Sequence, residues 1–145
     1  MERFNHMHFG FVTLIVFIWI NIGEIARAVF VAFPRMTKFF EGTGLTIGTM
    51  DINHALIWGL WDLVLTGVLV FIFWLCKQAF GNNSKAIFTS SILTVFATIG
   101  IFWIASINTG LGEWSSFVVI MPLAWIEFLI GAWISSKLYA RYDDE

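Results

Sequence analysis

The sequence predicts an all-α polytopic membrane protein, built as one bundle of four transmembrane helices. Hydrophobic residues make up 59% of the 145 residues, and charged residues make up only 12%. The mean hydropathy is +0.82, which sets the chain apart from ordinary water-soluble domains. Four apolar runs also reach the ~20 residues that a helix needs to cross a hydrocarbon core. A chain of this length has room for a single membrane domain.

The four runs define the predicted helices. They cover residues 9–33, 53–76, 86–107 and 116–138. Backbone N–H and C=O groups in lipid must be bonded within their own segment, so we expect helices rather than strands. The longest predicted connection is 34–52, opened by Pro34, with Phe39 and Phe40 placing part of it on the membrane surface. The other two connections are short polar turns, at residues 77–85 and 108–115.

The basic residues outside the predicted helices indicate the orientation. One side of the membrane receives Arg3, Lys77, Lys85, Lys137 and Arg141, and the other receives Arg35 and Lys38. Cytoplasmic loops carry the excess of Lys and Arg. We therefore expect both termini in the cytoplasm, and we expect the membrane to be a bacterial inner membrane.

The chain offers little covalent support, and its small size favours assembly. The single cysteine, Cys76, excludes an intramolecular disulfide. Small residues spaced about four apart allow close helix approach on the third and fourth helices: Ser90, Thr94 and Thr98, then Gly131 and Ser135. Because four helices of this size make a thin wall, we expect a homo-oligomer or a place in a larger membrane complex.

Three acids interrupt the apolar runs, one on each of three helices. They are Glu24, Asp62 and Glu127. A helix rises about 1.5 Å per residue, so counting inward from the outer helix ends places all three about 12 to 17 Å deep. Arg27 lies one turn from Glu24 toward the outside, and Asn21 lies one turn below it. The acids thus share one predicted level, slightly to the outer side of the membrane centre.

Helical spacing predicts that these groups face one another. The second helix carries a stripe spaced by four: His54, Trp58, Asp62 and Thr66. Asn21, Glu24 and Arg27 are similarly aligned on the first helix. A charge at the lipid-facing centre of a helix costs about 3 kcal/mol on insertion scales, so polar stripes turn inward. We expect the stripes to meet in the bundle interior.

The charge count of this group indicates a function. Three carboxylates and one guanidinium cannot all be ionised in a low-dielectric interior without further compensation. Arg27 can neutralise one carboxylate, most simply Glu24. The excess then requires a protonated acid, a bound cation or a water-filled cavity open to the outside. We therefore predict a small transporter or channel subunit with an outward-facing acidic site for a proton, a metal ion or an organic cation.

The residues assigned to this site fall in two groups. The ionisable group would exchange and tune the cation: Glu24, Arg27, Asp62 and Glu127. The lining group would surround it: Asn108, His54, Trp61 and Trp125. Indole faces beside carboxylates suit an organic cation, although plain packing also accounts for tryptophans at this depth. Whether a metal or a cofactor takes part stays open.

Two other functions remain compatible with the sequence. In the first, the chain is an accessory subunit of a larger membrane complex, and the polar groups serve helix assembly. In the second, it is a membrane enzyme or redox subunit acting on a lipid, quinone or haem, with the acids as general acid and base. His6 and His8 are predicted at the opposite membrane face from His54, so they cannot form a two-histidine haem site within one subunit. No zinc cluster, nucleotide fingerprint or nucleophile elbow is present, and nothing indicates a nucleic-acid partner.

Overall fold

The computed structural model describes residues 4–46 and 51–143, and its regular secondary structure is entirely helical. The elements in order are α1 (His6–Arg27), η1 (Ala28–Ala32), α2 (Phe33–Phe40), α3 (Ile52–Phe80), α4 (Ser84–Val95), η2 (Phe96–Gly100), α5 (Ile101–Asn108) and α6 (Trp114–Asp143). They form four continuous helical rods, which are long and apolar enough to cross a membrane: His6–Phe40, Ile52–Phe80, Ser84–Asn108 and Trp114–Tyr142. The prediction of four helices long and apolar enough to cross a membrane is confirmed.

The rods are longer than the apolar runs that predicted them, because polar caps extend their ends. Asn5 accepts hydrogen bonds from the backbone N–H groups of the first turn of α1, and Asn83 does the same for α4. Gly81 ends α3 with a φ of +79°, a conformation that favours glycine. Polar side chains at these positions complete a helix end without adding to its hydropathy. The sequence pattern therefore placed the ends too far inside.

The first rod continues through Pro34, where a connection was predicted to begin. Proline lacks an N–H, and in an α-helix its ring clashes with the carbonyl four residues earlier, here that of Phe30. The structure accommodates Pro34 by a wider π turn just before it, in which the N–H of Phe33 bonds the carbonyl of Ala28. The helix then runs on to Phe40, so only the later part of the predicted connection is non-helical. Residues 47–50 of that connection lie outside the described residues.

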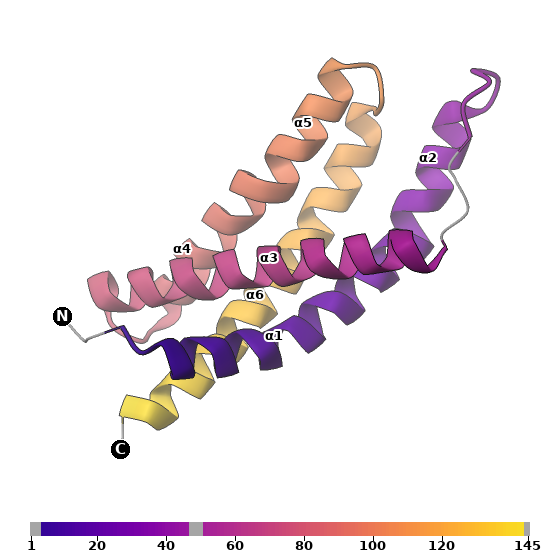
Figure 1. The fold of residues 1–145 in the computed structure, drawn as a ribbon. Coiled ribbons are helices and arrows are strands. Elements are labelled where there is room, and N and C mark those ends of the chain that lie inside the picture. The colour runs from indigo at the N-terminus through magenta and orange to yellow at the C-terminus, as the bar shows by residue number, and fades with distance from the viewer. Residues whose placement is uncertain (1–3, 47–50, 144–145) are drawn as a thin grey trace.

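A second π turn, η2, joins α4 to α5. Thr94 and Thr98 each donate a side-chain hydrogen bond of 2.7 Å to the carbonyl one turn earlier, a pattern that bends helices. The two π turns make α2 and α5 the continuations of α1 and α4 past a change in hydrogen bonding (Figure 1). Sharp changes of direction in helices commonly occur at such turns.

The four rods pack in a ring, with each long helix against its neighbours in the chain. α1 contacts α3 and α6, and α4 contacts α3 and α6. The start of α1, the turn between α3 and α4, and the end of α6 lie together at one end of the molecule (Figure 1). We call this the terminal end, and we call the opposite end the far end. The fully buried side chains of the half next to the terminal end include Val16, Ile20, Leu69, Phe73 and Phe128. In the far half, Trp103 and Ile120 are also buried.

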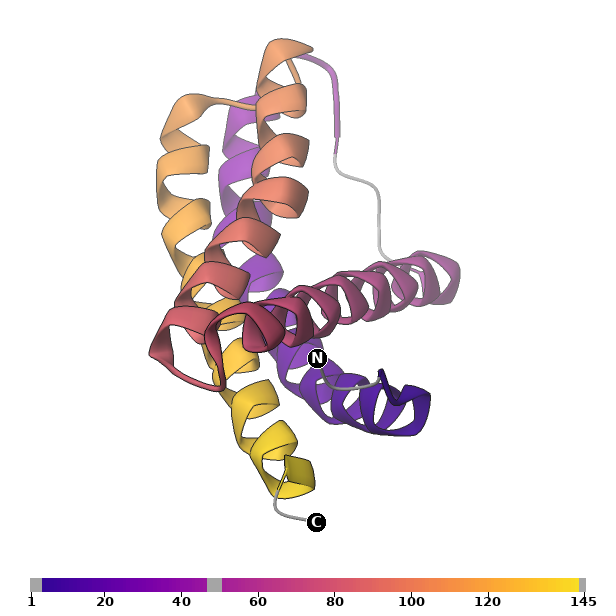
Figure 2. The same ribbon diagram turned by 90° about the vertical axis from the view of Figure 1, so that its left-hand side faces the viewer.

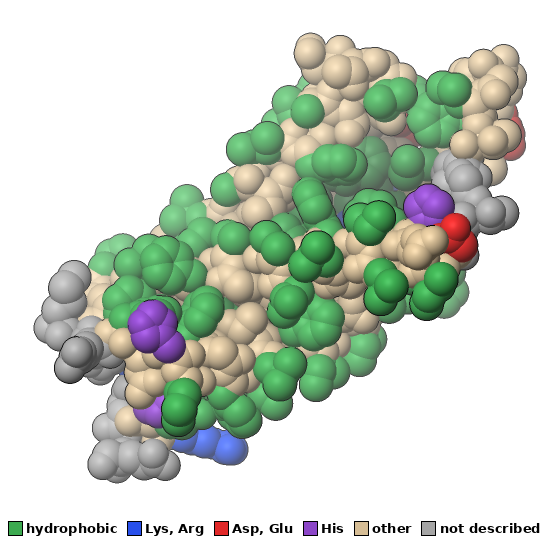
Figure 3. All heavy atoms as spheres, in the orientation of Figure 1, with side chains coloured by type: hydrophobic (Ala, Val, Ile, Leu, Met, Phe, Trp, Pro, Cys, Tyr) green, Lys and Arg blue, Asp and Glu red, His purple; other side chains and the backbone are tan. Residues whose placement is uncertain are grey.

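The far half of the bundle is divided. The far part of α3 runs at a wide angle to α5 in both ribbon views (Figures 1 and 2). The residues of α3 from Ile52 to Trp61 are exposed, apart from the half-buried Gly59. The first buried residue of the helix is Asp62. Figure 3 shows the recess between α3 and the arm formed by α5 and α6. We call this recess the split.

Outside the middle of the bundle, the described histidine and basic side chains lie near its two ends. His6 and His8 begin α1 at the terminal end, whereas His54 lies near the start of α3 at the far end (Figure 3). The predicted separation of these histidines is confirmed. The described basic residues divide as the orientation argument assumed: Lys77, Lys85, Lys137 and Arg141 toward the terminal end, and Arg35 and Lys38 on α2 toward the far end. Arg3 lies outside the described residues.

Candidate functional site

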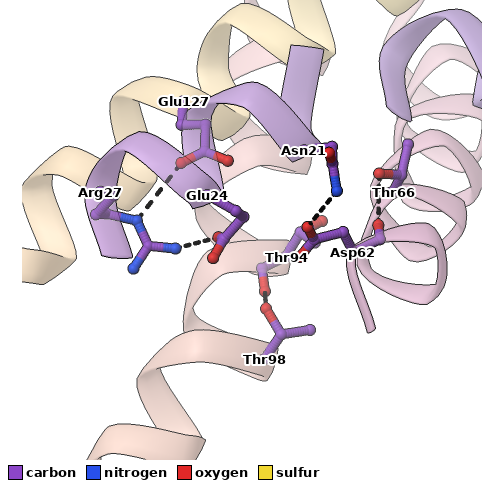
Figure 4. A network of polar contacts seen from close by, with 8 residues as sticks. All are labelled: Asn21, Glu24, Arg27, Asp62, Thr66, Thr94, Thr98 and Glu127. Atoms are coloured by element: carbon purple, nitrogen blue, oxygen red, sulfur yellow. Dashed lines mark hydrogen bonds and ion pairs between the residues drawn. The ribbon is translucent and has the colours of Figure 1, made fainter. Parts of the chain in front are cut away.

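A cluster of polar side chains lies where the split meets the packed half of the bundle. It is made of Asn21, Glu24 and Arg27 from α1, Asp62 from α3 and Glu127 from α6 (Figure 4). We call these five residues the acidic cluster. The spacing of three along α1 puts its members on one face of that helix, and α1 contacts both α3 and α6. The face thus presents its polar groups to the acids of two neighbouring helices.

Arg27 connects two of the three acids. Its Nη2 forms an ion pair with Oε1 of Glu24, and its Nε lies 3.5 Å from Oε2 of Glu127. The side chains are largely buried, with exposed fractions of 9% for Arg27, 15% for Glu24 and 6% for Glu127. A planar guanidinium with several donors suits such bridging. The sequence argument paired Arg27 with Glu24, and the structure adds Glu127 as a second partner.

Glu127 is held against α1 by a glycine. A Cβ on Gly23 would lie 2.6 Å from the Cδ of Glu127 and 2.7 Å from its Cγ, so only glycine leaves room for this side chain. The indole N–H of Trp19 also donates to the backbone carbonyl of Glu127, at 2.9 Å. The second carboxylate oxygen, Oε1, is buried without a hydrogen-bond partner in residues 4–46 and 51–143 and is turned away from Arg27 (Figure 4). Glu127 thus has one oxygen near a cation and one oxygen without a donor.

Asp62 is the acid of the cluster that forms no ion pair with the described residues. Its exposed fraction is 3%, and its Oδ2 accepts a hydrogen bond of 2.8 Å from the side-chain amide of Asn21. The hydroxyl of Thr66 donates to the main-chain carbonyl of Asp62, at 2.7 Å, and leaves the carboxylate untouched. Figure 4 shows Glu24 and Arg27 on the same helix, α1, as Asn21, the donor to Asp62.

Sequence reasoning did not assign Asn21 or Gly23 to the site. Asn21 shares the stripe of Glu24 and Arg27, and that spacing was the available signal. Nothing in a single sequence indicates that Gly23 receives the side chain of Glu127, because the contact joins residues more than a hundred positions apart. The bond from Asn21 to Asp62 likewise depends on how α1 meets α3.

Four residues expected to line the site lie outside the acidic cluster. Trp61 is beside the split, with its ring 6.1 Å from that of Phe102 on α5. Trp125 faces α4, where its indole N–H donates to the hydroxyl of Ser91 at 3.3 Å. Asn108 is exposed at the last position of α5. His54, in the first turn of α3, is also exposed.

His54 belongs to a helix cap at the far end. Its ring Nδ1 lies 2.8 Å from Oδ1 of Asp51, and the same oxygen accepts the backbone N–H of His54 at 3.0 Å. The bond from the backbone N–H, followed by the bond from the ring, holds the pKa of Asp51 below its usual value. This pair starts α3 and has no contact with the acidic cluster.

The donor set of the acidic cluster suits a proton or a weakly coordinated cation. Over residues 4–46 and 51–143, no three His, Cys, Asp or Glu side chains come close enough together to hold a metal ion. A buried carboxyl group that has only an amide donor, as Asp62 has, is stable when it is protonated or when a cation lies beside it. No protein-family model matches the sequence, and comparisons with curated proteins and with solved structures also find no match.

Proposed function

We propose that this protein is a small integral membrane transporter or channel subunit that exchanges protons or a cation at the acidic cluster. One observation carries the proposal. Asp62 is buried and has no ion pair in the described residues, while the one guanidinium of the cluster already pairs with Glu24 and Glu127. The cluster has more carboxylates than cations, and that excess needs an exchangeable positive charge.

The shape of the bundle supports access from one side. The split opens at the far end (Figure 3), and Asp62 is the first buried residue of α3 after the exposed segment 52–61. Toward the terminal end, the interior is filled by fully buried apolar side chains, among them Ile20, Leu69 and Phe73. An intramembrane acidic site open on one side and closed on the other is what an alternating exchange of ions requires. π turns, which flank the split here, are frequent at functional sites.

The distribution of basic residues supports an outward-facing split. The terminal end carries the larger group of lysines and arginines, and cytoplasmic loops have this excess. We therefore propose that the terminal end lies in the cytoplasm, that the split opens to the outside, and that the membrane is a bacterial inner membrane. We also propose a homo-oligomer, in which helices of neighbouring subunits would help to enclose the site.

The experiment uses the full chain reconstituted into liposomes that contain a pH-sensitive dye. Proton movement is followed when a K⁺ diffusion potential is imposed, and again when an alkali-metal or divalent cation is added outside. We expect movement with the wild type. Asp62→Asn and Glu127→Gln are expected to abolish it while still inserting, because each removes an exchangeable carboxylate and keeps the side-chain shape.

Glu41→Gln is the matched control. Glu41 caps α2 and is exposed, so its loss should leave proton movement unchanged. Wild-type movement in both Asp62→Asn and Glu127→Gln would overturn the proposal. No movement by the wild type under any gradient would also overturn it.

A second candidate function is that of an accessory subunit in a larger membrane complex. It is favoured by α3, whose residues 52–61 are exposed around the helix, because a partner helix could pack there. Crosslinking in the native membrane distinguishes the two functions. An accessory subunit should crosslink through this segment to a different protein and show no ion movement by itself.

A further inference from the structure

Three aromatic rings stand beside the split, next to the acidic cluster. The rings of Trp58 and Trp61 on α3 are 6.3 Å apart and nearly perpendicular, and the ring of Trp61 is 6.1 Å from that of Phe102 on α5. Their exposed fractions are between 39% and 46%. Trp58 is one turn before Asp62 on the same stripe of α3. We call these rings the aromatic trio, and it links the two helices that diverge at the split.

Below the trio lie buried oxygens that have not been neutralised. Among the described residues, Asp62 accepts a side-chain hydrogen bond from Asn21 alone, and Oε1 of Glu127 has no hydrogen-bond partner, although that side chain is more than nine-tenths buried. An unpartnered oxygen inside a buried carboxylate is costly unless a positive group or a proton reaches it. Among Glu24, Arg27 and Glu127, the side chain of Glu24 is the most exposed. The carboxyl group of Asp62 thus lies one helical turn from Trp58, a member of the aromatic trio.

Aromatic rings beside uncompensated carboxylates favour a large, weakly hydrated cation. Small hard ions such as Mg²⁺ and Ca²⁺ need six or more oxygen ligands, and the described residues bring no three acidic, histidine or cysteine side chains into metal-binding range. Ring faces, by contrast, attract large cations that lose their water easily, such as quaternary ammonium groups. On the same exposed segment of α3, Ile57 and Leu60 are also apolar and exposed. They suit an apolar body attached to the charge.

We propose that the acidic cluster and the aromatic trio together bind a lipophilic monovalent organic cation, which enters through the split. The charged centre lies against Asp62, and the apolar body lies against Trp58, Trp61 and Phe102. Protons and the cation compete for the same carboxylates, so cation binding releases protons. This inference rests on the proposed exchange function and names its substrate class.

The test measures binding of tetraphenylphosphonium to the full chain in detergent by isothermal titration calorimetry. We expect saturable binding whose affinity falls as the pH is lowered, because protons then occupy the carboxylates. Asp62→Asn should weaken binding about tenfold or more, and so should Trp58→Leu combined with Trp61→Leu. Trp133→Leu, an exposed tryptophan of α6 toward the terminal end, should have no effect. Neutral triphenylphosphine oxide should not bind.

Two results would overturn the inference. One is equal binding of the cation by wild type and Asp62→Asn; the other is equal binding of the neutral compound, since either would mean apolar partitioning alone. The proposed function is judged separately by the dye assay. Proton movement that depends on Asp62 and Glu127, without binding of the organic cation, removes this inference and leaves the exchange function standing.

Discussion

The two halves of the bundle are packed differently. In the terminal half, the four helices are in contact around Val16, Ile20, Leu69 and Phe128. In the far half, α3 leaves α5, and its side chains from Ile52 to Trp61 are exposed. The acidic cluster lies at the boundary. The acidic cluster therefore lies where the close packing of all four helices ends.

The stripe His54, Trp58, Asp62 and Thr66 records this change along one helix. Its first two members are exposed, and its last two are buried. Spacing by four shows that the residues share a face, but it carries no information about what covers that face. The packing of α3 against its neighbouring helices determines which members of the stripe are buried. A variant that disturbs one half should therefore have little effect in the other.

Removing the cation of the cluster should have the largest effect. Arg27→Gln leaves Glu24 and Glu127 without their shared partner, and breaking a buried ion pair in this way costs about 3 to 5 kcal/mol. The free energy of unfolding, measured by denaturation in mixed micelles, should fall by that amount. Adding Glu127→Gln should recover part of the loss, because it removes one uncompensated charge.

Arg35→Gln serves as the control for Arg27. Arg35 lies on α2, with one hydrogen bond of 3.5 Å to the backbone of Ser115, and its loss should change stability by less than about 0.5 kcal/mol. If Arg27→Gln were as mild as Arg35→Gln, the cluster would not be electrostatically coupled as described.

A matched leucine pair should compare the halves directly. Leu69 is fully buried in the terminal half, whereas Leu60 is exposed in the far half of the same helix. Leu69→Ala should cost about 2 kcal/mol or more, because a cavity remains in a packed core. Leu60→Ala should stay within about 0.5 kcal/mol. Equal losses in the micelle denaturation assay would show that the far half is packed after all.

Two glycines provide the smallest and most local comparison. A Cβ on Gly131 would lie 2.9 Å from Cδ2 of Leu69 and 3.2 Å from Cδ1 of Ile20, whereas a Cβ on Gly59 meets nothing within 4 Å. Gly131→Ala should therefore lower the free energy of unfolding by about 1 to 2 kcal/mol through overpacking. Gly59→Ala should leave it unchanged or raise it by about 0.5 kcal/mol, since alanine favours the helix. A stabilising Gly131→Ala would contradict close packing in the terminal half.

Run length and hydropathy were sufficient to predict the four helices. Their ends were not, because caps such as Asn83 are polar and lie beyond the apolar runs. The π turn after Arg27 was also not predicted. A proline such as Pro34 interrupts the regular α-helix, but the chain can respond either by leaving the helix or by widening one turn. Pro34 was interpreted as the start of a connection, whereas in the structure the helix widens by one π turn and continues to Phe40.

The candidate site divides in the same way. Helical depth and spacing were enough to single out Glu24, Arg27, Asp62 and Glu127, which the structure places in one cluster. The partners of each acid depend on rotation and contact between helices, which a single sequence does not contain. Asn21 as the donor to Asp62 and Gly23 as the surface beneath Glu127 are contacts of this kind. His54 and Asn108 were assigned by depth alone and lie at the far end.

The accessibility of position 62 tests the central claim that the acidic cluster opens only to the far end. Asp62→Cys and Thr66→Cys are made separately in a Cys76→Ser background and reconstituted in liposomes of known orientation. A membrane-impermeant thiol reagent is then applied from each side. We predict that the cysteine at position 62 reacts from the far end alone, and that the cysteine at position 66, fully buried one turn nearer the terminal end, reacts from neither. Reaction of position 62 from the terminal end, or from neither side, would contradict the account.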